Sequence, residues 1–157
     1  MSINPQQFRE HVIRATLQPM GLWSIEAEEL MIGTAAHESQ LGRYIVQVGG
    51  PALGVFQMEP ATHRDIYQTF LVYNNKLMGR IHGVVPMTGR TAEHMITDLR
   101  YACVMARLKY YRVSEALPAV DDLQGQARYW KQYYNTPKGR GTVEQYVADY
   151  RKYVRGE

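Results

Sequence analysis

The chain has 157 residues, of which 45% are hydrophobic and 21% are charged. This length suits one compact domain over residues 1–157 with a sizeable core, and the composition excludes a disordered chain or a coiled coil. The formal net charge of +3 is spread along the chain without a run of like charges, which gives a nucleic-acid-binding role little support.

Capping residues mark the start of the first helices. An Asn-Pro pair predicts a helix over about residues 5–17. Ser24 is expected to cap a second helix that runs to about Glu38. Residues 39–54 are rich in glycine and are therefore expected to form a long loop with, at most, a minimal β-hairpin.

Further helices are predicted in the rest of the chain. Pro60 opens one, residues 74–90 are expected to form a loop, and the longest helix is expected over about 92–112. The last two helices are predicted to begin at Asp122 and at Thr142, which starts a capping box. The predicted fold class is therefore mainly α.

The first residues and the single cysteine bear on where the protein works. Residues 1–16 lack the apolar core of a signal peptide, and no apolar run approaches the roughly 20 residues of a membrane span. Cys103 has no partner for an internal disulfide, and its place within a predicted helix indicates a small buried hydrophobe. We expect a protein made in the cytoplasm that can fold in a reducing compartment.

Several chemistries fail at their defining residues. His37-Glu38 begins like a zinc-protease helix, but Leu41 stands where the second histidine is required. No serine lies in a G-x-S-x-G turn, and the "VGGPALG" segment lacks the Lys-Ser/Thr ending of a phosphate-binding loop. Carboxylate chemistry remains.

Glu38 has two interpretations from periodicity alone. It falls on one helical face with Ala27, Met31 and Thr34, which predicts an inward position. Burial and the nearby negative end of the helix would both raise the pKa of its carboxyl group, as an acid catalyst requires. The alternative is a solvated charge at a frayed helix end, where acidic residues usually lie.

Two segments in order resemble the soluble lytic transglycosylases and goose-type lysozymes. The first is "AAHESQLGR", which contains Glu38 and Ser39, and the second is "GVFQMEPAT", which contains Phe56 and Gln57. Further on, "WKQYYNTPKGRG" is similar to a Tyr-Asn segment of that family. The resemblance extends over about residues 25–150.

The resemblance implies a lysozyme-like helical domain with a saccharide groove. It implies cleavage of the β-1,4 bond between N-acetylmuramic acid and N-acetylglucosamine in peptidoglycan, with Glu38 as general acid and then base. The muramyl C6 hydroxyl would close a 1,6-anhydro ring, so one carboxylate suffices and neither a metal ion nor a cofactor is needed. The substrate-binding residues implied by the resemblance are Ser39, Phe56, Gln57, Tyr134 and Asn135.

The chain also departs from the family pattern. Glu59 stands at a usually apolar position, where it is either a solvated charge or a second carboxylate that positions water in a muramidase-type hydrolase. Asp98, Ala102 and Thr136 replace other residues that the family often has. A third alternative is a module that binds glycan or another virion protein without cleavage.

The size and the missing signal peptide agree with a bacteriophage protein. Such a protein would act on the cell wall either as a virion component during entry or as a lysis protein released through a membrane pore. Its expected partners are peptidoglycan glycan strands and, in a virion, other virion proteins.

Overall fold

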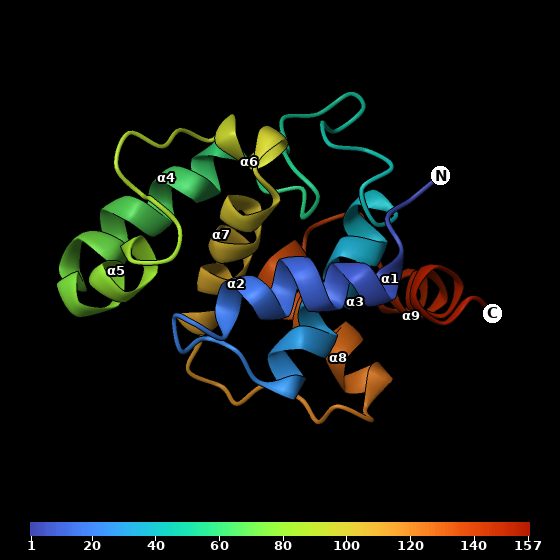
Figure 1. The fold of residues 1–157 in the computed structure, drawn as a ribbon. Helices are drawn as coiled ribbons and strands as arrows, with labels where there is room; N and C mark the ends of the chain where they lie inside the picture. Colours follow the sequence, from blue (N-terminus) through green and yellow to red (C-terminus); the bar gives the residue numbers. More distant parts are fainter.

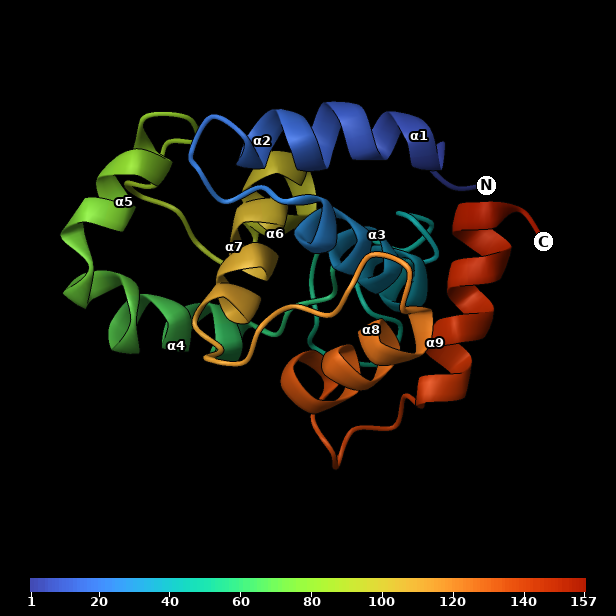
Figure 2. The same cartoon turned by 90° about the horizontal axis from the view of Figure 1, so that it is seen from below.

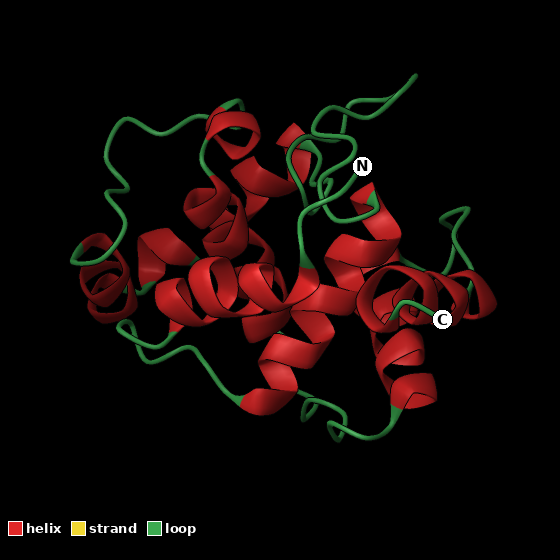
Figure 3. Ribbon diagram, turned by 45° about the vertical axis from the view of Figure 1, so that its right-hand side comes forward, coloured by secondary structure: helices red, strands yellow, loops and turns green.

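The computed structural model describes residues 1–157 and confirms the mainly α fold class (Figure 3). The helical segments, in chain order, are α1 (Pro5–Gln7), the π-helical η1 (Phe8–Arg14), α2 (Ala15–Leu17), α3 (Ile25–Ser39), α4 (Pro60–Thr69), the 3-10 helix η2 (Leu71–Tyr73), α5 (Asn75–His82), α6 (His94–Thr97), α7 (Leu99–Tyr111), α8 (Leu123–Trp130), the π-helical η3 (Lys131–Asn135), α9 (Val143–Asp149) and the π-helical η4 (Tyr150–Arg155). Isolated antiparallel bridges join Val46 to Leu53 and Leu53 to Met58 in place of a sheet.

The first helix is continuous through α1, η1 and α2 and lies along one side of the molecule (Figures 1 and 2). The Asn4 side chain accepts a hydrogen bond from the backbone of Gln7 at 3.1 Å, which confirms the predicted start. Phe8, Ile13 and Leu17 are fully buried along its inner face. None of the helices in the structure is both long enough and apolar enough to cross a membrane.

Helix α3 runs through the middle of the molecule and is packed by η1, α7, α8, α9 and η4 (Figure 2). Ser24 caps it through a 3.0 Å hydrogen bond from the backbone of Ala27, as predicted. Gly33 faces Tyr146 so closely that any side chain at position 33 would overlap the phenol. The small residues of α3 therefore let α9 approach, and this contact fixes the end of α3 where Glu38 lies.

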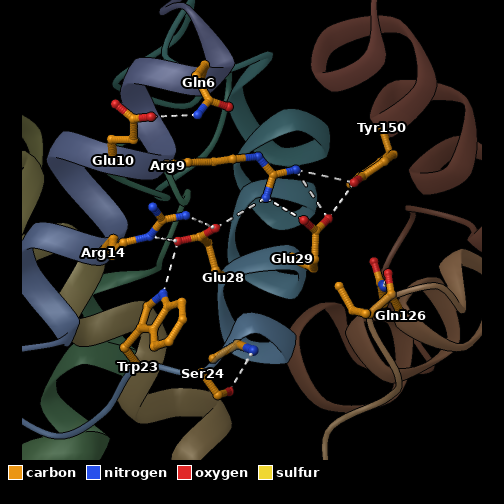
Figure 4. A network of polar contacts seen from close by, with 12 residues as sticks. Gln6, Arg9, Glu10, Arg14, Trp23, Ser24, Glu28, Glu29, Gln126 and Tyr150 are labelled. Atoms are coloured by element: carbon orange, nitrogen blue, oxygen red, sulfur yellow. Dashed lines mark hydrogen bonds and ion pairs between the residues drawn. The ribbon is translucent and has the colours of Figure 1, made fainter.

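Partly buried ion pairs join the first helix to the start of α3 (Figure 4). Arg14 Nε and Nη2 donate to the two oxygens of Glu28, each at 3.0 Å, and Trp23 Nε1 donates to the same carboxylate at 2.9 Å. Arg9 Nη1 donates to Glu29 at 2.5 Å, and Glu29 also accepts from the Tyr150 hydroxyl. These contacts hold three segments of the chain together at the end of α3 opposite Glu38.

Two predictions for the middle of the chain were wrong. The expected loop over residues 74–90 contains α5, whose Leu77 and Ile81 are buried one helical turn apart. The long helix expected over 92–112 is broken at Asp98, whose backbone is extended. The Asp98 carboxylate accepts from the backbone of Arg100 at 3.0 Å and so caps α7 instead.

The C-terminal helices follow the predicted pattern closely. Asp122 caps α8 through a 2.8 Å hydrogen bond from Gly125. Both hydrogen bonds of the Thr142–Gln145 capping box are present at the start of α9. Cys103 is fully buried in α7, which confirms its structural role and raises the pKa of its thiol.

Candidate active site

Glu38 lies one residue before the end of α3, with its side chain half-buried. The indole Nε1 of Trp130 donates a hydrogen bond to Glu38 Oε1 at 3.0 Å. No group of the protein donates to Oε2, and Glu38 lines a groove. One oxygen is therefore held in place while the other is available to a ligand, and the inward interpretation of Glu38 is the one that the geometry supports.

Trp130 is itself held by a set of aromatic contacts. It is fully buried in α8, with the His37 ring 4.4 Å away edge-on and the Tyr146 ring at 5.3 Å. His37 Nδ1 in turn lies 2.8 Å from Asp149 Oδ2, so the histidine ring has little freedom to turn. Helices α8 and α9 thus fix the direction of the indole N–H that Glu38 accepts.

The groove has a volume of about 610 Å³. It is lined by the end of α3, by parts of the segment over residues 47–62, by Lys109 and by residues 134–141. Most of the lining side chains are polar, and they come from segments far apart in the sequence. A groove of this kind offers many hydrogen bonds to a polar ligand and few apolar contacts.

Burial raises the pKa of the Glu38 carboxyl group. The charge of His37, the Trp130 hydrogen bond and the charge of Lys109 oppose this shift by favouring the carboxylate. Burial is the largest of these effects, so the carboxyl group retains its proton to a higher pH than an exposed glutamate. The raised pKa favours the protonated form of Glu38, in which the carboxyl group can donate a proton to a ligand in the groove.

Lys109 places an amine in the wall of the same groove. Its Nζ donates to the backbone oxygen of Tyr134 at 2.5 Å and lies 4.2 Å from the centroid of the Tyr134 ring. Burial lowers the pKa of Lys109 to about 8, although Glu38 and Glu59 oppose that shift. The ammonium charge is thus present at neutral pH and acts on Glu38 from α7.

Tyr134 and Gln57, two of the residues that the resemblance implies to bind substrate, line the groove. The Tyr134 hydroxyl donates to the backbone oxygen of Phe56 at 2.7 Å, which joins η3 to the loop before α4. Gln57 has a left-handed backbone (φ 48°), and its side chain donates to the Gly54 oxygen at 2.9 Å. Gly54 is required there because a side chain would overlap the Met95 carbonyl.

Ser39 and Phe56, which the resemblance implies to be substrate-binding residues, support the groove but do not line it. The buried Ser39 hydroxyl donates to Ala35 O at 3.1 Å and accepts from Gly42 N at 2.9 Å, so it stabilises the end of α3. The Phe56 ring is buried 5.9 Å from that of Phe8. Only the backbone carbonyl of Phe56 is connected to the groove, because it accepts the hydrogen bond from the Tyr134 hydroxyl of η3.

Asn135 lines the groove at the start of the loop over residues 135–141. Lys131 Nζ donates to Asn135 Oδ1 and to the Gly139 carbonyl, both at 2.7 Å, and so holds the two ends of this loop together. Gly141 lies against His37 and Trp130, where a side chain would meet both rings. The loop is thereby anchored to the residues that hold Glu38.

Glu59 is an exposed residue at the N-cap of α4 and also lines the groove. Its position leaves both earlier interpretations open, since a groove carboxylate can contact ligand or water. No three His, Cys, Asp or Glu side chains gather closely enough to hold a metal ion.

Trp130 and Lys109 are the site residues that sequence reasoning missed. Trp130 had no expected role, although it is the first residue of the "WKQYYNTPKGRG" segment. Lys109 shares a helical face with the buried Ala102 and Ala106, so a lysine on an apolar stripe was the signal that could have found it. No local pattern pairs Trp130 with Glu38, because 92 residues separate them.

No protein-family model matches the chain, and no curated protein or solved structure matches it either.

Proposed function

We propose that the protein is a peptidoglycan lytic transglycosylase that uses Glu38 as general acid and then base. The observation that carries the proposal is the Glu38 carboxyl group in a polar groove, with Oε1 held by the Trp130 indole and its pKa raised by burial. The motif resemblance supplies the substrate, since the groove itself indicates only a polar ligand.

The proposed reaction requires one carboxyl group and no water. Glu38 donates its proton to the glycosidic oxygen, and the bond from that oxygen to the muramyl C1 breaks. The Glu38 carboxylate then takes the proton of the muramyl C6 hydroxyl while O6 bonds to C1. The products are a free 4-hydroxyl on N-acetylglucosamine and a 1,6-anhydromuramyl end, and Glu38 regains its proton.

The other groove residues have supporting roles in this proposal. The ammonium of Lys109 favours the carboxylate form of Glu38, which assists the first proton transfer, from the Glu38 carboxyl group to the glycosidic oxygen. Gln57, in the loop before α4, and Asn135, at the end of η3, both line the groove and offer their amide groups to the sugar. Tyr134 provides part of the groove wall, with its hydroxyl committed to the Phe56 carbonyl.

A hydrolase is the second candidate, and Glu59 is the observation that favours it. Its exposed carboxylate lines the same groove as Glu38, as a residue that activates water must. Such an enzyme would add water to C1 and leave a reducing end. The transglycosylase remains the stronger proposal, because Glu38 alone can carry out both proton transfers of that reaction.

Loss of turbidity of purified peptidoglycan tests whether the protein cleaves glycan at all. The wild-type protein should clear the suspension, whereas Glu38→Gln should not, while its circular dichroism spectrum and unfolding midpoint stay close to wild type. Clearing by Glu38→Gln at the wild-type rate would contradict the catalytic role. Sedimentation with peptidoglycan without clearing by either protein would favour the non-catalytic binding module.

A further inference from the structure

A second pocket lies between α4 and the segment before α6. It has a volume of about 330 Å³ and shares no lining residue with the groove that contains Glu38. We call it the α4 pocket. Its polar lining includes His63, Arg64, Tyr67, Arg90, Thr91 and Glu93. Nothing in the proposed glycan chemistry uses these residues.

A chain of hydrogen bonds runs behind the wall of the α4 pocket. His63 Nε2 lies 2.5 Å from the Tyr101 hydroxyl, which lies 3.0 Å from the Tyr67 hydroxyl. Tyr101 is fully buried and does not line the pocket, whereas His63 and Tyr67 both line it. His63 is only 7% exposed, and its second nitrogen, Nδ1, has no partner in the protein. Both ends of the chain therefore lie at the pocket.

Proton counting gives this chain two directions when His63 is neutral. In the first, Tyr67 donates to Tyr101, Tyr101 donates to His63 Nε2, and the imidazole proton is on Nδ1. In the second, His63 Nε2–H donates to Tyr101, Tyr101 donates to Tyr67, and the Tyr67 hydroxyl is free to donate into the pocket. Burial lowers the pKa of His63, so the neutral ring is the form to consider above the ordinary imidazole range.

Two guanidinium groups with free donors at the α4 pocket favour an anion. Arg64 has no ion-pair partner, and Arg90 is fixed over the Tyr101 ring by bonds to the Pro86 carbonyl at 2.7 Å and to Asp98 at 3.0 Å. One nitrogen of Arg90, Nη2, makes no hydrogen bond to the protein. A guanidinium held in this way can donate to an oxyanion with little loss of side-chain freedom.

Glu93 is the one acidic residue in the lining. Hydrogen bonds from its own backbone and from Thr91 lower the pKa of Glu93, so it is ionised and its charge opposes an anion. The Glu93 carboxylate already accepts hydrogen bonds from the protein, whereas Arg64 and Arg90 each keep free N–H donors. Because Asp98 is paired with Arg90, the formal charges of Arg64, Arg90, Glu93 and Asp98 cancel, and the preference for an anion rests on the free guanidinium donors of Arg64 and Arg90.

We propose that the α4 pocket binds a small oxyanion, a carboxylate or a phosphate group, between Arg64 and Arg90, and that the Tyr67 hydroxyl donates to it. Because Tyr67 then accepts from Tyr101, the ligand selects the second direction of the chain and places the His63 proton on Nε2. The direction of the hydrogen-bond chain, and with it the tautomer of His63, thus shows whether the pocket is occupied.

NMR of the imidazole nitrogens tests this proposal on the full chain. Inorganic phosphate and acetate are titrated separately, above the ordinary imidazole pKa, with chloride replaced to keep ionic strength constant. We expect a saturable change of His63 toward the Nε2–H tautomer. A response to phosphate alone identifies a phosphate site, and a response to acetate identifies a carboxylate site. No saturable His63 response to either ion would overturn the proposal.

Two variants separate the charge from the hydrogen-bond chain. Arg64→Gln should weaken binding by at least about tenfold, since it removes a charge-assisted donor from an exposed position. Tyr67→Phe should abolish the tautomer response while keeping the ring. Arg128→Gln makes the same charge change on the exposed face of α8 and should bind as wild type. Equal affinity of Arg64→Gln and Arg128→Gln would contradict the site.

Discussion

The indole Nε1 of Trp130 lies 3.0 Å from Glu38 Oε1 and donates a hydrogen bond to it. The bond joins the end of α3 to the end of α8. It is the only hydrogen bond that the Glu38 side chain makes with the protein, so it decides where the free oxygen points.

Trp130→Phe should therefore reduce activity more than it reduces stability. The phenyl ring keeps most of the packing against His37, but it cannot donate to Glu38, whose orientation is then lost. We expect kcat to fall by about tenfold to a hundredfold and the pKa of Glu38 to rise, since the lost bond favours the carboxylate. Turbidity assays over a range of pH would measure both effects.

Trp23→Phe is the matched control for that change. Trp23 Nε1 also donates to a carboxylate, that of Glu28 at 2.9 Å, but at the other end of α3. This variant should lose stability and keep the wild-type rate per folded molecule. Equal losses of activity in Trp23→Phe and Trp130→Phe would show that the indole bond to Glu38 has no special role.

Lys109→Met should move the alkaline limb of the pH profile to higher pH. In the proposed reaction, activity requires a protonated Glu38 and should be lost as pH rises through the pKa of Glu38 in the free enzyme. The Lys109 ammonium lowers that pKa, and the charge is present below the Lys109 pKa of about 8. Removing it lets the pKa of Glu38 rise further, so the proton is retained to higher pH.

The profile of kcat/KM against pH measures this shift, with Lys76→Met on the exposed face of α5 as the control. The methionine keeps an apolar stem against the Tyr134 ring, so folding should be preserved. An alkaline limb that stays in place, or moves to lower pH, in Lys109→Met would contradict the electrostatic coupling to Glu38.

Glu59→Gln separates the two proposed enzymes. A transglycosylase that needs only Glu38 should keep most of its rate, because Glu59 is exposed and its amide replacement preserves the N-cap position of α4. A hydrolase that activates water through Glu59 should lose about 10²-fold or more in kcat. Initial rates of glycan release by the purified variant decide between these outcomes.

The sequence predicted the local features of this site better than its long-range contacts. Ser24 and the spacing of Ala27, Met31 and Thr34 predicted α3 because capping and periodicity act within a few turns. The Trp130–Glu38 pairing depends on how α8 packs on α3, and no pattern within either helix contains that information. The burial of Ser39 and Phe56 could not be predicted for the same reason, since motif position does not say which way a side chain points.

The two errors in secondary structure have local causes. Gly79 and Gly83 favoured a loop over residues 74–90, but burial of Leu77 and Ile81 outweighs the cost of a glycine within α5. Asp98 was read as an interior helix residue, although aspartate prefers to cap a helix by accepting from its first backbone N–H groups. In both regions the sequence also contained the signal for the observed structure, namely the spacing of Leu77 and Ile81 and the capping preference of Asp98, but the prediction gave that signal less weight.

Glu28→Gln should destabilise the fold without affecting the groove. The Glu28 side chain is 1% exposed and accepts from both Arg14 and Trp23, so the amide loses charge-assisted bonds that no water can replace. We expect a loss of about 2–3 kcal/mol in the free energy of unfolding by urea. Glu26→Gln, at a half-exposed position with no ion pair, should cost less than about 1 kcal/mol.

Mass spectrometry of the soluble products tests the central claim most directly. Purified peptidoglycan is digested with wild-type protein and with Glu38→Gln under the same conditions, and the muramyl ends of the fragments are compared. The account predicts 1,6-anhydromuramyl ends from the wild-type protein and no fragments from Glu38→Gln. Reducing muramyl ends from the wild-type protein, or anhydro ends from Glu38→Gln, would contradict it.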